Sequence, residues 1–195
     1  MTGNVKLTEE LELVRDLDAL KDVERQNPLA ENPRRERVAE HSWHLAAAAI
    51  LLQDYVDTDV DLGRAVQLAV VHDVVEMFVG DTFAFGDTSD QFEREHAAMA
   101  KLIERTGSDG VRRLVELWQE YEDQESNEAK FVKGLDALLP IMHNYSNPDH
   151  SSWRRHNVEA DKVLTRLNSH GNMGKSLRDF GEEMINDAKV RGYLT

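Results

Sequence analysis

Two histidines and two aspartates, far apart along this chain of 195 residues, are of the types that hold metal ions. They are His41, the adjacent pair His72 and Asp73, which begins 31 residues later, and Asp136, a further 63 residues along. Imidazole nitrogen suits zinc, iron, nickel and copper, while carboxylate oxygen suits magnesium and manganese. A divalent cation can turn water into a nucleophile. We therefore expect these four residues to bind one divalent cation, whose identity (Mn, Co, Fe, Ni, Zn or Mg) their types leave open.

Each of the two aspartates stands in an apolar stretch. Asp73 lies within residues 68–75, which are otherwise apolar apart from His72, and Asp136 is flanked by Leu and Ala. An ionised carboxylate is rarely buried without a partner, because its desolvation is costly. Two such acids account for each other if both bind the same cation. The alternatives are a helix that reaches the surface at His72, and an ordinary ion pair between Asp136 and Lys133 one turn earlier.

Two further acids follow the His-Asp pair closely. Glu76 lies four residues after His72 and three after Asp73, which predicts a place on the same side of a helix. There it could act as a general base or acid for the attacking water. Asp81, within Gly80-Asp81-Thr82, could support the water or the leaving group. The alternatives are an exposed helical Glu and an ordinary turn Asp.

Basic residues near these positions are candidates for binding an anion. They are Arg25, Arg34, Arg35, Arg37 and Lys133. The guanidinium group of Arg can donate two parallel hydrogen bonds to phosphate oxygens. Taken singly, each of these residues is more often surface charge.

The composition excludes several kinds of chemistry. The chain has no Cys, so thiolate metal ligands, disulfides and a Cys nucleophile are excluded. Its formal net charge of −14 argues against a nucleic acid polymer as partner, because such a partner requires a basic surface. The charge does not exclude a small phosphorylated substrate, because a bound cation and a few local basic residues set the field inside a pocket.

Neither a membrane span nor a secretory signal is predicted. The N-terminal sequence is acidic and mixed around residues 8–10, and the longest apolar stretch is Leu45–Leu52. A membrane-spanning helix needs about 20 apolar residues, and a signal peptide begins with a basic segment. We therefore expect a cytoplasmic protein without a membrane partner.

Helical periodicity runs through nearly the whole chain, and no alternating run of β-branched residues marks a strand. The expected helices cover about residues 11–20, 38–55, 62–78, 89–105, 111–121, 126–144, 158–168 and 175–191. Residues 27–36, with two Pro and two Asn, predict a connecting loop. The pattern predicts an all-α fold of about seven or eight helices in a single domain, residues 1–195. Its metal-binding core covers about residues 38–145, and further helices occupy residues 150–195.

The remaining histidines are expected to have plainer roles. His44 lies one turn after His41 and shares its helix face, where packing is favoured over a role as an extra ligand. His150, His156 and His170 are expected at the surface.

The order and spacing of these residues resemble the HD-domain metal-dependent phosphohydrolases, most closely the branch related to 5′-deoxynucleotidases. The motifs that carry the resemblance, between about residues 13 and 145, are Ala39-Glu40-His41-Ser42, Val71-His72-Asp73-Val74-Val75-Glu76, Val79-Gly80-Asp81-Thr82, Glu116-Leu117-Trp118-Gln119-Glu120-Tyr121-Glu122 and Phe131-Val132-Lys133-Gly134-Leu135-Asp136. The resemblance implies a helical HD domain with metal ligands His41, His72, Asp73 and Asp136. It also implies that Glu76 and Asp81 act in catalysis, and it favours Arg25 and Lys133 as the groups near the substrate phosphate.

The reaction implied by this resemblance is hydrolysis of a nucleoside 5′-monophosphate to nucleoside and phosphate. Several relatives carry a Trp within a few residues of the position matching Arg25, where this chain has Gln26-Asn27-Pro28. The choice between ribose and deoxyribose therefore stays open. A non-enzymatic module that binds metal and nucleotide, and an HD hydrolase of di- or triphosphates, are the alternatives. The resemblance also leads us to expect a homodimer.

Overall fold

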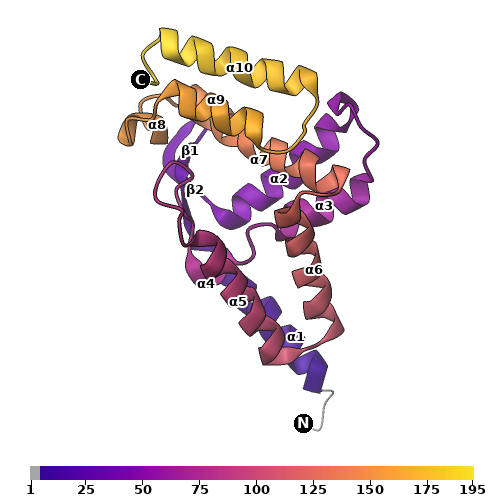
Figure 1. Ribbon diagram of the computed structural model, residues 1–195. Coiled ribbons are helices and arrows are strands. Elements are labelled where there is room, and N and C mark those ends of the chain that lie inside the picture. The colour runs from indigo at the N-terminus through magenta and orange to yellow at the C-terminus, as the bar shows by residue number, and fades with distance from the viewer. Residues whose placement is uncertain (1–4) are drawn as a thin grey trace.

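The computed structural model describes residues 5–195, and the expected all-α class is confirmed (Figure 1). The longer helices are α1 (Val5–Asp16), α2 (Val38–Leu52), α3 (Leu62–Val71), α5 (Gln91–Thr106), α6 (Asp109–Asp123), α7 (Asn127–Ser146), α9 (Ala160–Ser169) and α10 (Lys175–Val190). The short α segments are α4 (Glu76–Val79) and α8 (Ser152–Arg155), and 3-10 turns cover Leu17–Lys21 and Gln53–Tyr55. Within the described residues, the number of long helices agrees with the sequence pattern.

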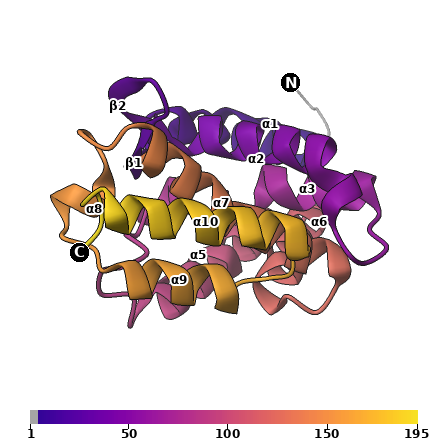
Figure 2. The same ribbon diagram turned by 90° about the horizontal axis from the view of Figure 1, so that it is seen from above.

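Helix α7 lies at the centre of the upper part of the molecule. It packs against α2 and α3 on one side and against α9 and α10 on the other (Figures 1 and 2). Its apolar residues, among them Phe131, Leu135 and Leu138, belong to the larger hydrophobic core. A smaller core joins α1, α5 and α6 at the other end through Met99, Leu102 and other residues. A polar side chain on α7 is therefore surrounded by several other helices.

The prediction of a loop over residues 27–36 is wrong. Strands β1 (Glu24–Leu29) and β2 (Asn32–Arg37) form an antiparallel hairpin, in which Glu24 pairs with Arg37 and Leu29 with Asn32. The buried positions of the hairpin include Arg25, Pro28 and Glu36, so its inner face carries two charged residues. An apolar and polar alternation could not have revealed strands of this kind. Two strands without further neighbours also tolerate Pro, because many of their backbone groups need no partner in a sheet.

The helix expected over residues 62–78 is interrupted just where the His-Asp pair stands. Helix α3 ends at Val71, and a tighter turn follows before α4 begins at Glu76. In this turn Val74 N donates to Val71 O at 3.0 Å and Glu76 N donates to Asp73 O at 3.0 Å, which are three-residue steps. The expected position of Glu76, on the same side of one continuous helix as His72 and Asp73, assumed regular helix geometry. That geometry does not apply here, because the turn lies between α3 and Glu76.

Several predicted helix starts are confirmed by their capping bonds. The side chains of Asp61, Ser108 and Ser126 accept from the backbone N–H three residues later, at 3.0 to 3.1 Å. The helix expected from about residue 89 begins at Gln91, and the side chain of Asp90 before it makes no capping bond within the described residues. Among the described residues, no helix combines the length and the apolar character that crossing a membrane demands.

Candidate metal centre and substrate pocket

The four predicted metal-binding residues come together from three helical segments. His41 stands in the first turn of α2, His72 and Asp73 directly follow α3, and Asp136 lies in the middle of α7. His41 Nε2 is 2.9 Å from Asp136 Oδ1, and His72 Nε2 is 3.0 Å from Asp73 Oδ2. His72 Nε2 and Asp136 Oδ1 are 3.9 Å apart. Both imidazoles are buried. The tertiary structure thus gathers two imidazoles and two carboxylates at one point.

The hydrogen bonds of His72 fit a metal ligand. Its Nδ1 lies 2.9 Å from the backbone oxygen of Ala69, an acceptor, so Nδ1 carries the proton. Its Nε2 therefore presents a lone pair, and this buried atom has no hydrogen-bond donor as partner in the part of the chain that the structure describes. A buried nitrogen of this kind, facing two carboxylates, is what a divalent cation requires. His41, His72 and Asp73 also offer ligand atoms that all lie within 4.8 Å of one another.

Asp136 is held from two sides. Its Oδ1 faces His41, and its Oδ2 accepts a hydrogen bond from the buried hydroxyl of Tyr121 at 3.0 Å. Burial raises the pKa of Asp136, but the hydrogen bond with His41 and the interactions with His41, His72 and Arg25 outweigh this effect, so the pKa lies well below its ordinary value. Asp136 is therefore an oriented carboxylate anion.

Arg25 places a buried positive charge beside the two aspartates. Its Nη1 donates to Asp73, and its Nη2 lies 3.8 Å from Asp136 Oδ1. Burial raises the pKa of Asp73, but its interactions with His72 and Arg25 outweigh this effect, so the pKa lies below its ordinary value. Arg25 is directed inward because it stands on the buried face of β1. The hairpin that the sequence did not reveal is thus the element that positions this residue.

Glu76 and Asp81 are acids of a different kind, since neither is stabilised as an anion. Burial and the charge of Asp73 raise the pKa of Glu76 well above its ordinary value, although Arg25 opposes the shift. Burial also raises the pKa of Asp81, against the opposing charge of Arg25. One carboxylate oxygen of each is buried without a hydrogen-bond partner. Groups with raised pKa values in a pocket are suited to exchange protons near neutral pH.

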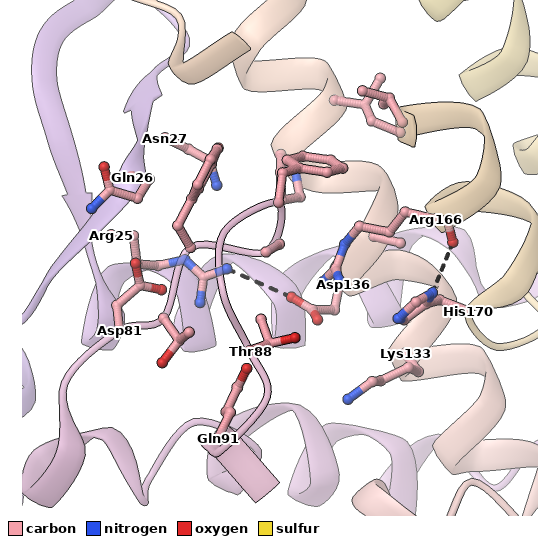
Figure 3. A pocket seen from close by; sticks show the side chains of 18 of the residues that line it. Arg25, Gln26, Asn27, Asp81, Thr88, Gln91, Lys133, Asp136, Arg166 and His170 are labelled. Atoms are coloured by element: carbon pink, nitrogen blue, oxygen red, sulfur yellow. Dashed lines mark hydrogen bonds and ion pairs between the residues drawn. The ribbon is translucent and has the colours of Figure 1, made fainter. Parts of the chain in front are cut away.

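A cavity of about 430 Å³ opens beside these residues (Figure 3). Arg25, Glu76, Asp81 and Asp136 line it, while His41 and His72 lie behind this wall. Aromatic and amide side chains and part of α9 complete the lining: Gln26, Asn27, Phe83, Phe85, Asn144, Trp153, Arg166 and His170. This size is within the range of pockets for small ligands. The cavity is therefore lined by ionisable, amide and aromatic side chains together.

Lys133 also lines the cavity, and it does not form the ion pair with Asp136 that was the alternative to metal binding. Its Nζ lies 3.3 Å from Glu122 and 4.2 Å from the ring centre of Tyr121, and its acid partner is Glu122 instead of Asp136. The arginines near His41 are elsewhere. Arg34 binds Glu40, and Arg34, Arg35 and Arg37 are not among the residues that line the cavity.

The sequence did not single out Glu36 or His143, which form a second buried cluster with His44. We call these three residues the Glu36 cluster. Glu36 Oε2 lies 3.4 Å from Nδ1 of His41, and its Oε1 lies 3.8 Å from Nδ1 of His143. The rings of His44 and His143 stack at 5.2 Å. The expected packing role of His44 agrees with this contact. Glu36 stands between Arg35 and Arg37 in the sequence, and these charged neighbours did not predict that its side chain is buried.

The structure confirms only part of the prediction for the C-terminal histidines. His150 and His156 are exposed, as expected. His170 is half-buried and lines the cavity, so its assignment to the surface is wrong. The contact arises because the end of α9 packs on α7, which a local reading of the sequence cannot show.

Comparisons with known proteins agree with this arrangement. Residues 17–175 match the family described as HD domain. The chain is 34% identical over 149 residues to the human protein named 5′-deoxynucleotidase HDDC2, which covers 74% of this chain and 72% of that protein. For the bovine protein of the same name the identity is 36% over 135 residues, which covers 68% of this chain and 64% of that protein.

A solved structure shows the same arrangement of helices. It is that of a protein from Magnetospirillum magnetotacticum MS-1, described as a predicted metal-dependent phosphohydrolase, with a TM-score of 0.86 and 37% identity. The match covers 97% of this chain and 96% of that one. The PH0347 protein from Pyrococcus horikoshii OT3, at 21% identity and a TM-score of 0.65, shares the fold.

Proposed function

This chain belongs to the HD domain family and is a phosphohydrolase, and we propose that it hydrolyses a nucleoside 5′-monophosphate to nucleoside and phosphate. The observation that carries this proposal is the contact between the buried His and Asp residues and a cavity large enough for a nucleotide. Asp136 belongs to both, because it faces His41 and lines the cavity. The relatives' name, 5′-deoxynucleotidase, favours a deoxyribonucleotide as substrate.

One divalent cation fits the four residues His41, His72, Asp73 and Asp136, which we propose as its ligands. The free Nε2 of His72 and the two anionic carboxylates support this assignment. A bound divalent cation of this type polarises a phosphoryl oxygen and lowers the pKa of water. The cation is one of Mn, Co, Fe, Ni, Zn or Mg.

Glu76 and Asp81 would manage the protons. Each has a carboxylate oxygen without a hydrogen-bond partner, and both line the cavity next to Arg25. Because their pKa values are raised, each can take a proton from the attacking water or give one to the nucleoside oxygen that leaves. We assign Glu76 as the principal base, since it is the more deeply buried of the two.

Arg25 and Lys133 would bind the phosphate of the substrate. Both line the cavity on either side of Asp136, and their positive charges would oppose the charge that develops on the phosphoryl oxygens (Figure 3). Three aromatic side chains of the lining, Phe83, Phe85 and Trp153, would contact the nucleoside. The phosphate then lies beside the ionisable residues.

Phosphate release from a panel of substrates tests the proposal. The protein is freed of metal, reloaded with each cation in turn, and given nucleoside mono-, di- and triphosphates with ribose or deoxyribose. We expect hydrolysis of monophosphates with at least one cation. A protein that binds cations but releases phosphate from none of the monophosphates would contradict the proposal. Release of phosphate from triphosphates alone would favour the alternative reaction, hydrolysis of nucleoside triphosphates by an HD domain.

Three further expectations accompany this proposal. The match over residues 17–175 supports one domain that extends over residues 1–195. A homodimer and a cytoplasmic location stay predictions. Light scattering on the purified protein tests whether it is a homodimer. Fractionation of cells that express the protein tests whether it is cytoplasmic.

A further inference from the structure

Arg166 is a cation of the cavity that has no acid partner among the described residues. It stands on α9, is half-buried and lines the cavity. The other cations of the lining are paired, Arg25 with Asp73 and Lys133 with Glu122. Within residues 5–195, by contrast, the guanidinium of Arg166 makes no ion pair with any carboxylate. Acidic side chains are abundant in this chain, whose net charge is −14. Because none of those described pairs with Arg166, its guanidinium group is available to an anionic ligand.

The end of α9 is fixed close to Lys133 by a tight contact with α7. Gly171 has a φ of 63°, and a Cβ there would lie 2.1 Å from the backbone oxygen of Lys130. Asn172 N donates to the same oxygen at 2.8 Å. His170 Nδ1 lies 3.0 Å from the backbone oxygen of Arg166. Only glycine permits this approach, so the position of Arg166 is built into the packing of two helices.

Arg166 and Lys133 lie together on one side of Asp136, and Arg25 lies on the other. Figure 3 shows the side chain of Arg166 reaching from α9 toward Asp136, with Lys133 and His170 beside it. The pKa of His170 is lowered by burial and then by the charges of Arg166 and Lys133, in keeping with a shared location. Two neighbouring cations repel each other, and an anion between them removes this cost.

We propose that Arg166 binds the phosphate of the substrate together with Lys133, from the side opposite to Arg25. The ligand class is a phosphate dianion, either the phosphate of the nucleotide or the inorganic phosphate product. The guanidinium of Arg166 would donate to non-bridging oxygens that Arg25 does not reach. Helix α9 then belongs to the active site, although it lies outside the segment that carries the metal-binding motifs. The inference rests on the proposed function, because it assigns one more residue to the same pocket.

Titration calorimetry with inorganic phosphate tests this inference without turnover. The full-length protein is compared with Arg166→Ala and Arg166→Lys, in metal-free and Mg²⁺-loaded form. The matched control is Lys162→Ala, which removes a positive charge from the exposed face of the same helix. We expect Arg166→Ala to weaken phosphate binding by about 10- to 100-fold, as for loss of a charge-assisted hydrogen bond, and Arg166→Lys to weaken it less. The control should bind like the wild type.

A second ligand separates a phosphate contact from a general effect on the pocket. Adenosine, which has no phosphate, should bind Arg166→Ala and the wild type equally. Equal loss of adenosine and phosphate binding would overturn the inference, as would unchanged phosphate binding in Arg166→Ala. With a monophosphate substrate, KM should rise in the same variant. If the wild type binds phosphate through Arg166 but hydrolyses no nucleotide, the proposed function fails while the anion site stands.

Discussion

Two clusters of acid and histidine side chains lie side by side in this protein, and they differ in how they are connected to the cavity. His41, His72 and Asp73 form the first group, and the Glu36 cluster forms the second. Each group has three potential ligand atoms within 4.8 Å of one another. Among the described residues, neither group lines the cavity itself. The first contacts the lining residue Asp136 through His41, and the second contacts the lining residue Arg25 through Glu36. The carboxylate that faces the first group therefore distinguishes two groups that residue types and distances alone would treat as equals.

The charges of the two clusters differ as well. The first contains Asp73 and has Asp136 as a neighbour, and the pKa values of both acids are lowered. The second contains one carboxylate, Glu36, which faces Nδ1 of His41 at 3.4 Å and Nε of Arg25 at 3.6 Å. Glu36 thus contacts the proposed ligand His41 and the proposed phosphate-binding residue Arg25. On the proposed assignment, the first cluster supplies direct ligands of the cation, and Glu36 of the second supports one of them from behind.

Removing a ligand from the first cluster should have the largest effect. We expect Asp136→Ala to lose the cation and to reduce turnover by more than about 1,000-fold, because about 4 kcal/mol or more of transition-state stabilisation depends on the ion. Elemental analysis and phosphate release measure the two losses. His44→Ala, the corresponding change in the Glu36 cluster, should retain both. Equal loss of metal in the two variants would abolish the distinction between the clusters.

Replacing Glu76 should separate chemistry from metal binding. Glu76→Gln keeps the size of the side chain but cannot accept a proton as a carboxylate does. We expect a normal metal content and melting temperature with kcat lower by about 100- to 10,000-fold, the usual contribution of a general acid or base. The variant Glu95→Gln, which changes another buried acid of the lining, is the control and should retain more activity. Unchanged kcat in Glu76→Gln would refute the role of this residue.

Glu36→Gln should weaken metal binding without removing a ligand. Loss of the carboxylate behind His41 should lower the affinity for the cation by about 10- to 100-fold, as for other outer partners of metal-binding histidines. Calorimetric titration with Mn²⁺ measures the affinity. Glu24→Gln, on the exposed side of the same hairpin, is the matched control. If both variants bind Mn²⁺ like the wild type, Glu36 has only a packing role.

Metal affinity should depend on pH through His41. Burial and the charge of Arg25 lower its pKa, but hydrogen bonds with Asp136 and Glu36 outweigh them and raise it to about 9. A bound cation must displace this proton, so the affinity should rise with pH by up to about ten-fold per unit until pH 9. Titrations at pH 7, 8 and 9 in a buffer that does not bind metal measure the slope. An affinity independent of pH would show that His41 is already neutral.

His143 should show the smallest effect, on stability alone. Burial lowers its pKa, so the folded protein binds this proton less readily than the unfolded chain does. The free energy of unfolding should therefore fall as the pH drops below about 6.5, by at most about 1.4 kcal/mol per unit from this residue. Urea unfolding at pH 7.5 and 5.5 should show a smaller difference for His143→Gln than for the wild type. His150→Gln, at an exposed position, should not change the difference.

Local sequence patterns predicted most of the helices but not the conformations of the segments that connect them. The caps at Asp61 and Ser126 were readable because each bond joins residues three apart. The hairpin escaped notice because its buried positions include Arg25 and Glu36, and charged residues suggest a surface loop. The turn at His72 was also missed, since an apolar segment of this length favours one continuous helix. In both places, the hairpin and the turn at His72, the burial of polar side chains departs from what the neighbouring residues suggest.

The sequence by itself determined the helical class, the absence of thiol chemistry and the identity of four residues suited to one cation. These depend on residue type and on spacing within single segments. The tertiary structure decided which charges meet: Arg25 with Asp73, Glu36 with His41, and Arg166 with the cavity beside Lys133. Such pairs join positions far apart in the chain, and their geometry follows from how helices pack, for which the order of residues gives no local signal.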